Sequence, residues 1–101
     1  MASMKNDEAK KILSNTPAEK AFWVNNGQVL KNLIELATAA KKLTAEQFAH
    51  HVSSTKNDFA KWVDEVIRDS ELAKEIRKAR TKEDMAKAVI NRLKHLQKLL
   101  G

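Results

Sequence analysis

Three histidines, His50, His51 and His95, are the side chains in this sequence best suited to bind a metal or to move a proton. Neighbouring residues on a helix point about 100° apart, so His50 and His51 cannot hold one ion from a single helix. A zinc site also needs three or four ligands at suitable spacing. The sequence has no cysteine, which excludes thiolate ligands, disulfides and cysteine nucleophiles. We therefore expect no metal site and no cofactor.

His51 and Asp58 are close enough in sequence to form an acid–base pair. Asp58 also fits a structural role at the start of a helix, where the helix dipole favours a negative charge. His51 precedes that start and can hydrogen-bond Asn57 or Asp58. No nucleophile or oxyanion site accompanies the pair, and Gly27 is isolated rather than part of a phosphate-binding loop. The structural role is therefore favoured, and we expect no enzyme.

Positive charge is concentrated at the end of the chain. The net charge is +6, and no acidic residue follows Asp84. On a helix Lys87, Asn91, Lys94 and Lys98, at spacings of 4, 3 and 4, share one face. This face is either merely solvated, or it meets nucleic-acid phosphates or an acidic partner protein. The candidate partner or phosphate contacts are Lys87, Asn91, Arg92, Lys94, His95 and Lys98.

The aromatic side chains are a second candidate surface. Aromatic rings with basic neighbours can stack on nucleic-acid bases. Three of the five lie on apolar helical stripes, however, which favours packing in a core. Phe22 and Trp23 cannot both point inward from one narrow helix face, so one of them, with Trp23 the better candidate, is expected to be partly exposed. The full set is Phe22, Trp23, Phe48, Phe59 and Trp62.

Four threonines indicate where helices begin. Thr16, Thr44, Thr55 and Thr81 are each followed, three residues later, by an acid or a glutamine. A threonine hydroxyl at a helix start accepts a bond from an unpaired backbone N–H, and the side chain three residues on bonds back to the threonine N–H. The sequence has one proline and two glycines, which leaves little turn material for a sheet. These features predict short helices with short loops and no strands.

Apolar spacing predicts the helices themselves. Residues from Gln28 to Lys42 are apolar around most of a helical cylinder, which is typical of a helix surrounded by others. The sequence Asn25-Asn26-Gly27 predicts a boundary or sharp bend before it. We therefore expect an all-α fold, a compact bundle of four to six short helices around a central apolar helix at about residues 28–42. Its expected core is Leu30, Leu33, Ile34, Ala37, Phe48, Val52, Phe59, Trp62, Val63, Val66, Leu72, Ile76, Val89, Leu93 and Leu96.

The length of 101 residues predicts one domain. Residues 1–15, with a short charged helix at 7–14, are expected to be a flexible or frayed segment, and residues 16–101 a single helical domain. A second methionine at Met4 suggests that residues 1–3 are a remnant of expression. No apolar run approaches the ~20 residues that cross a bilayer, and no signal peptide is recognisable. We expect no membrane partner and a cytoplasmic location.

Several segments resemble a family of small all-helical domains of unknown function from archaea and bacteria. The most specific is Asn57-Asp58-Phe59-Ala60-Lys61-Trp62. The similarity extends from about Phe22 to Leu96. It implies a helical fold and brings no activity that can be transferred. The other matching segments are Phe22-Trp23-Val24-Asn25-Asn26-Gly27, Leu33-Ile34-Glu35-Leu36, Phe48-Ala49-His50-His51-Val52 and Asp69-Ser70-Glu71-Leu72-Ala73-Lys74-Glu75-Ile76.

Two functions remain open at this point. A well-capped helical scaffold without reactive groups favours a non-enzymatic protein-interaction module with a protein partner. The alternative is weak, non-specific nucleic-acid binding through the basic face of the last helix. The sequence leaves the identity of the partner, the biological process and the oligomeric state open.

Overall fold

Helices account for most of the chain. A computed structural model describes residues 2–101, with side chains from Asn6 onward. Within these residues a 3₁₀ turn η1 (Ala18–Lys20) precedes a hairpin of β1 (Phe22–Trp23) and β2 (Val29–Leu30), and a π-helical turn η2 (Val63–Ile67) continues the fourth helix. The all-α bundle is confirmed. Its α-helices are α1 (Ala2–Leu13), α2 (Leu33–Lys42), α3 (Ala45–His51), α4 (Asp58–Trp62), α5 (Ser70–Lys78) and α6 (Lys82–Leu100).

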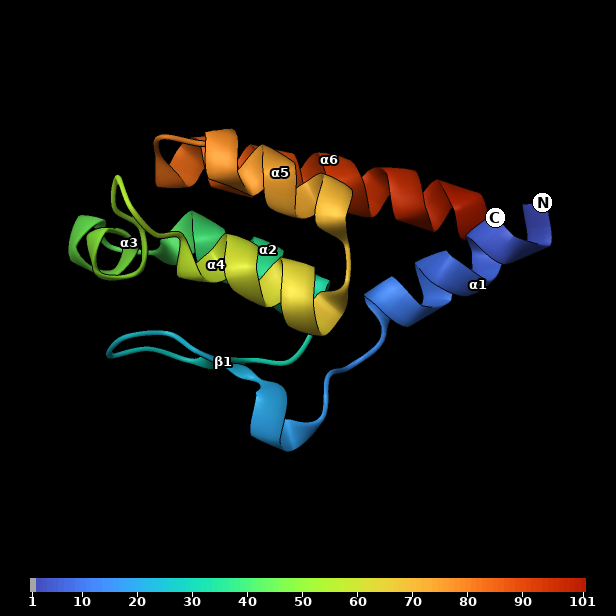
Figure 1. Cartoon of the computed structure of the whole chain (residues 1–101), viewed down its shortest axis with the longest axis horizontal. Coiled ribbons are helices and arrows are strands. Elements are labelled where there is room, and N and C mark those ends of the chain that lie inside the picture. Colours follow the sequence, from blue (N-terminus) through green and yellow to red (C-terminus); the bar gives the residue numbers. More distant parts are fainter. Residues whose placement is uncertain (1) are drawn as a thin grey trace.

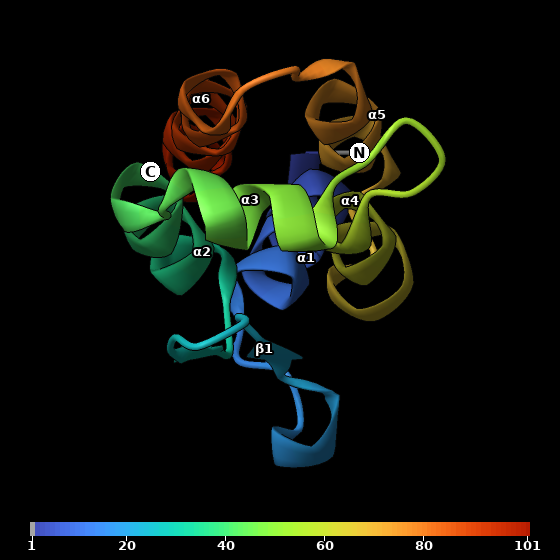
Figure 2. The same cartoon turned by 90° about the vertical axis from the view of Figure 1, so that its left-hand side faces the viewer.

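The helices form two layers, with α5 and α6 above α2 and α4 (Figure 1). Helix α3 crosses one end of the layers, and α1 lies at the other end, beside the end of α6 (Figure 1, Figure 2). The hairpin and η1 lie below α2 and α4, on the side away from α5 and α6 (Figure 2). The hairpin is therefore a separate feature attached to one side of the bundle.

Two of the four predicted threonine caps are confirmed. The Thr44 hydroxyl accepts from the N–H of Gln47 at 3.0 Å, and the Gln47 side chain accepts from the N–H of Thr44, also at 3.0 Å. Thr81 accepts from the N–H of Asp84 at 3.0 Å. These caps fix the starts of α3 and α6.

The other two cap predictions, at Thr16 and Thr55, are wrong. Asn57 begins α4 instead of Thr55, and its Oδ1 accepts from the N–H of Ala60 at 3.0 Å. Asparagine caps helices better than threonine. Asn57 also forms a bridge with Val52, which closes the short loop between them together with the bond of 2.8 Å from the N–H of Ser53 to the carbonyl of Lys56. Thr16 caps nothing, since its hydroxyl has no hydrogen-bond partner among the described residues. Its backbone N–H donates instead to the carbonyl of Lys31 at 2.7 Å.

The predicted central helix is present but starts later than residue 28. Asn32 caps it, and its Oδ1 accepts from the N–H of Glu35 at 2.8 Å. Residues 29–30 pair instead with residues 22–23 as a short antiparallel ladder, so the expectation of no strands is wrong. The bend predicted at Asn25-Asn26-Gly27 is confirmed as the hairpin turn, where Asn26 has a left-handed φ of 54°.

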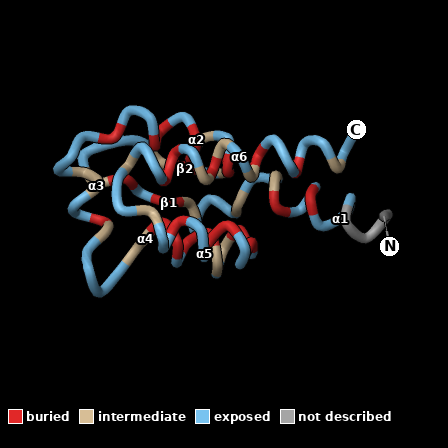
Figure 3. The backbone as a smooth tube through the Cα atoms, turned by 90° about the horizontal axis from the view of Figure 1, so that it is seen from above, coloured by how far each residue is buried: buried red, intermediate tan, exposed pale blue. Residues whose placement is uncertain are grey.

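Most of the predicted core is buried (Figure 3). Phe48, Val52 and Val66 are half-buried. The prediction that Ile34 belongs to the core is wrong, since this side chain is 50% exposed. Leu33 and Leu36 take the inward positions of α2 instead. The buried set predicted correctly is Leu30, Leu33, Ala37, Phe59, Trp62, Val63, Leu72, Ile76, Val89, Leu93 and Leu96.

The N-terminal segment contains a longer helix than the one predicted at residues 7–14. Helix α1 begins at Ala2, and its side chains Ala9 and Ile12 belong to the core. The expected division at residue 15 therefore separates a helix from a core to which it contributes. None of the described helices is long and apolar enough to cross a membrane.

Candidate functional site

The predicted basic face of α6 is exposed. Lys87, Asn91, Lys94 and Lys98 are all accessible to solvent, whereas Met85, Val89, Leu93 and Leu96 on the opposite side of the helix are buried. None of the three lysines takes part in an ion pair with another described residue. The face is free to meet an anionic partner.

Arg92 stands apart from that face because its guanidinium is already engaged. Its Nε donates to Asp69 Oδ2 at 2.7 Å, and Nη2 donates to Oδ1 of the same carboxylate at 3.0 Å. Nη1 adds a bond of 3.2 Å to Glu71. Asp69 also caps α5, since its Oδ1 accepts from the N–H of Leu72 at 3.2 Å. Arg92 therefore ties α6 to the start of α5.

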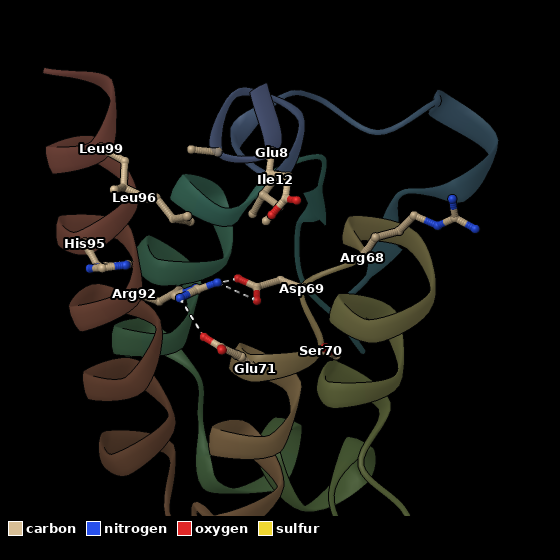
Figure 4. Close-up of a pocket in the computed structure, with 11 residues that line it drawn as sticks. Glu8, Ile12, Arg68, Asp69, Ser70, Glu71, Arg92, His95, Leu96 and Leu99 are labelled. Carbon is tan, nitrogen blue, oxygen red and sulfur yellow. Dashed lines mark hydrogen bonds and ion pairs between the residues drawn. The ribbon is translucent and has the colours of Figure 1, made fainter. Parts of the chain in front are cut away.

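This ion pair lies in a cleft of about 420 Å³ between α1, the start of α5 and α6 (Figure 4). His95, also a predicted contact, lines the same cleft. A second cleft, of about 400 Å³, lies between α1, the loop that follows it and η2. Glu8, Ile12 and Arg68 line both. The two clefts therefore flank α1.

His51 has the structural role that the sequence favoured. Its Nε2 accepts a bond of 3.0 Å from the backbone N–H of Asn25, so this nitrogen carries the lone pair and the ring proton is on Nδ1. Nδ1 donates to Asp58 Oδ2 at 3.0 Å. The ring is buried, at 5.0 Å from the Phe22 ring and 5.2 Å from Phe59 between centroids. Both nitrogens therefore hold parts of the fold together.

Among the described residues, no group of three or more His, Cys, Asp or Glu side chains is placed to hold a metal ion. Neither of the two clefts beside α1 is lined by His50, His51 or Asp58. Of the three histidines, only His51 forms side-chain hydrogen bonds among the described residues. These bonds connect the hairpin turn at Asn25 with Asp58 at the start of α4.

Asp58 has a pKa held below its usual value of 3.8. Partial burial raises the pKa, but hydrogen bonds from His51 and Lys56 and the charge of Lys56 outweigh that effect. Since the folded protein binds the proton less tightly than the unfolded chain, the ionised carboxylate stabilises the fold above about pH 4, and this stabilisation is lost as the pH falls further.

We expect the stability of Asp58→Asn to depend less on acidity than that of the parent protein. The free energy of unfolding, measured by urea titration between about pH 5 and about pH 2.5, should fall more steeply for the parent. Asp64→Asn, which removes a more exposed carboxylate paired at 3.7 Å with Arg77, is the control and should follow the parent. Identical slopes for parent and Asp58→Asn would contradict this assignment.

The outer side of the hairpin presents the most exposed large apolar side chain among the described residues. Trp23 is 72% exposed, which confirms the expectation that either Phe22 or Trp23 is exposed. On the neighbouring strand it pairs in register with half-buried Val29. Phe22 and Leu30, the neighbouring pair, face the core. Alternation along the two strands thus turns one pair inward and the other outward.

The hairpin is firmly attached to the bundle. The Phe22 ring stacks on Phe59 with centroids 4.8 Å apart, and Gln47 Nε2 donates to the carbonyl of Asn25 at 2.9 Å. A Cβ added at Gly27 would lie 3.0 Å from the same Gln47 nitrogen, so glycine permits this close approach. Trp23 is therefore exposed on a well-supported element.

Comparison with protein-family models, with curated proteins and with solved structures gives no match.

Proposed function

We propose that this protein is a non-enzymatic interaction module that binds an acidic, apolar segment of a partner protein through Trp23 and Val29. The observation that carries the proposal is the 72% exposure of Trp23 on an anchored hairpin. Tryptophan is among the residues that most often dominate binding energy at protein interfaces. Left in water it contributes little to the fold, so its position is best explained by a contact outside this chain.

Pre-organisation of the hairpin supports the proposal. Binding is weakened when a loop must be ordered first. Here both peptide groups that flank Asn25 are held: its N–H donates to His51 Nε2, and its carbonyl accepts from Gln47 Nε2. The neighbouring Phe22 is fixed by aromatic contacts. The cost of ordering the binding surface is therefore met by folding itself.

The charges beside Trp23 define the partner. Lys20 precedes Trp23 by three residues and Lys31 follows Val29 by two, and both are exposed. Neither lysine has an ion-pair partner among the described side chains. Together with the net charge of +6, they favour a partner with acidic residues around an apolar contact.

Two further expectations join this proposal. His51 is buried with both ring nitrogens bonded, which supports a non-enzymatic function. A sequence without cysteine is compatible with the cytoplasm, where we place the protein. Membership of the helical family that Asn57-Asp58-Phe59-Ala60-Lys61-Trp62 resembles remains a prediction.

The test is selection from a displayed library of short peptides in which acidic and aliphatic residues alternate, followed by titration of the best peptide. We expect Trp23→Ala to weaken binding by roughly thirtyfold, as for an interface residue that contributes about 2 kcal/mol. Lys20→Glu and Lys31→Glu should each weaken it several-fold, more at low salt. Lys87→Glu on α6 is the charge-matched control and should change little. Equal binding by Trp23→Ala and the parent would refute the proposal.

Nucleic-acid binding through α6 is the second candidate, favoured by the exposed row of Lys87, Lys94 and Lys98. The same variants, titrated with labelled single-stranded and duplex DNA, separate the two functions. Binding through phosphates falls steeply with rising salt, and Lys87→Glu would then weaken it while Trp23→Ala would not. If the protein binds the peptide as proposed, Trp23→Ala weakens peptide binding while Lys87→Glu does not.

A further inference from the structure

The hydrogen bonds of the hairpin determine which of its backbone groups point outward. The N–H of Val24 donates to the carbonyl of Gln28 at 3.0 Å, one step along the ladder from the pair of Trp23 and Val29. Bonded and non-bonded pairs alternate in an antiparallel ladder, so Trp23 and Val29 do not bond each other. Their N–H and carbonyl groups therefore point away from the hairpin, toward its two outer edges.

The edge of β1 faces the bundle. At one end of this edge, the N–H of Asn25 donates to His51 Nε2 at 3.0 Å. At the other end, Trp62 Nε1 donates to the carbonyl of Lys20 at 2.8 Å. Side chains of α3 and α4 thus flank the outward groups of Trp23 on both sides, and a further strand cannot run along this edge.

The edge of β2 is open beside Val29. Among the described residues, neither the N–H nor the carbonyl of Val29 has a hydrogen-bond partner. Two residues later, the carbonyl of Lys31 accepts from the N–H of Thr16 at 2.7 Å, so the chain that follows α1 closes the edge at that point. A strand edge with unpaired N–H and carbonyl groups is a template for another strand. The open part of this edge runs from Val29 to the hairpin turn, on the side of the bundle away from α5 and α6 (Figure 2).

We propose that the acidic, apolar partner segment binds as a third strand, added to the edge of β2 at Val29. This inference rests on the proposed function and specifies the conformation of the partner, which is an extended segment. The segment accepts from the N–H of Val29 and donates to its carbonyl, as in other complexes formed by strand addition. It runs antiparallel to β2, because a single residue of the segment then satisfies both groups of Val29.

The register of the added strand defines its side chains. The residue opposite Val29 places its side chain on the outer face of the hairpin, which carries Val29 and Trp23, and this side chain is apolar. Lys31 follows Val29 by two residues and is exposed, so an acidic side chain two positions from the apolar one lies within its reach. The segment therefore carries an acidic and an apolar residue with one residue between them, and it ends where Thr16 bonds Lys31.

Exchange of amide protons with water, followed by NMR, tests the strand addition without a variant. At saturation with the selected acidic peptide, exchange of the Val29 N–H should slow about tenfold or more, as for an amide that becomes hydrogen-bonded. The Trp23 N–H is the internal control. Its side chain belongs to the same interface, but this N–H points to the edge of β1 and should exchange nearly as before. Unchanged exchange at Val29 with the peptide bound would overturn the strand addition and leave the proposed function in place.

A series of methylated peptides provides the second measurement. Each residue of the selected peptide is N-methylated in turn, which removes one backbone N–H. Successive N–H groups of a strand point to opposite sides, so methylation at the residue opposite Val29 should weaken binding about tenfold, the effect of losing one such hydrogen bond. Methylation at the two neighbouring residues should change binding little. A scan without this alternation would also overturn the strand addition, whereas a peptide that binds the parent and Trp23→Ala equally would remove the proposed function and this inference with it.

Discussion

Trp62→Ala is expected to lower the free energy of unfolding by about 3–5 kcal/mol, as for large aromatic truncations in a core. Trp62 is 6% exposed, and its ring packs against Phe22 with centroids 5.7 Å apart. Its Nε1 donates to the carbonyl of Lys20 at 2.8 Å, a bond between residues far apart in sequence. The substitution therefore leaves a cavity and also removes one of the ties that hold the hairpin against the bundle.

Trp23→Ala is the matched control, because it removes the same side chain from a position 72% exposed. Its effect should remain within about 0.5 kcal/mol, the range of surface substitutions. Urea titration followed by far-UV circular dichroism measures the free energy of unfolding of both variants, since this signal does not depend on tryptophan fluorescence. Similar losses for the two variants would show that Trp23 is part of the core and would remove the basis of the proposed function.

Arg92→Met should cost about 2–3 kcal/mol of stability. The Asp69 side chain is 2% exposed, whereas that of Arg92 is 20% exposed. Removing one partner of a fully buried ion pair costs about 3–5 kcal/mol because the other charge is left uncompensated. Because Arg92 is partly exposed, water can approach this ion pair, and we expect a loss of stability below the range for a fully buried pair.

A second substitution distinguishes the buried charge from simple packing. Asp69→Asn added to Arg92→Met removes the uncompensated charge and keeps an oxygen that can accept from Leu72, so the double variant should be more stable than Arg92→Met alone. Lys94→Met, which removes an exposed cation from the same helix, is the control and should be nearly neutral. Chemical denaturation of the three variants checks the order. A harmless Arg92→Met would contradict the role given to the pair.

The bundle could be predicted from the sequence because its signals are local. The caps at Thr44 and Thr81 need only the residue three positions on, and the stripe from Phe59 to Val63 follows helical spacing. The hairpin was missed because its strands have two residues each, too short for alternation to be recognised. Asn32 is a good capping residue, but Val29 and Leu30 also fit a helix, and only pairing with residues 22–23 decides between them.

The candidate sites depend on contacts that local patterns do not contain. The exposure of a residue in the Phe22-Trp23 pair could be predicted, because adjacent bulky residues point in different directions. The pairing of Arg92 with Asp69 joins residues 23 positions apart, so Arg92 was grouped with the basic face of α6. The burial of Ala9 and Ile12 was likewise missed, since the helix predicted at residues 7–14 is short and charged, and α1 packs against distant elements, chiefly α6.

We predict two surfaces with separate roles. The interior of the hairpin holds the fold together through Phe22, while its exterior is left to a partner through Trp23. The basic row on α6 adds a general attraction for acidic molecules. A variant at one of these surfaces should therefore leave binding at the other intact.

The most direct measurement is a ¹H–¹⁵N spectrum of the chain during titration with the selected acidic peptide. The two tryptophans give two indole N–H signals, assigned with Trp23→Phe. The account predicts that the Trp23 signal shifts until saturation, together with the amides of residues 21–31, while the Trp62 signal, bonded inside the protein to Lys20, stays in place. A stationary Trp23 signal with the peptide bound, or shifts confined to the amides of α6, would contradict it.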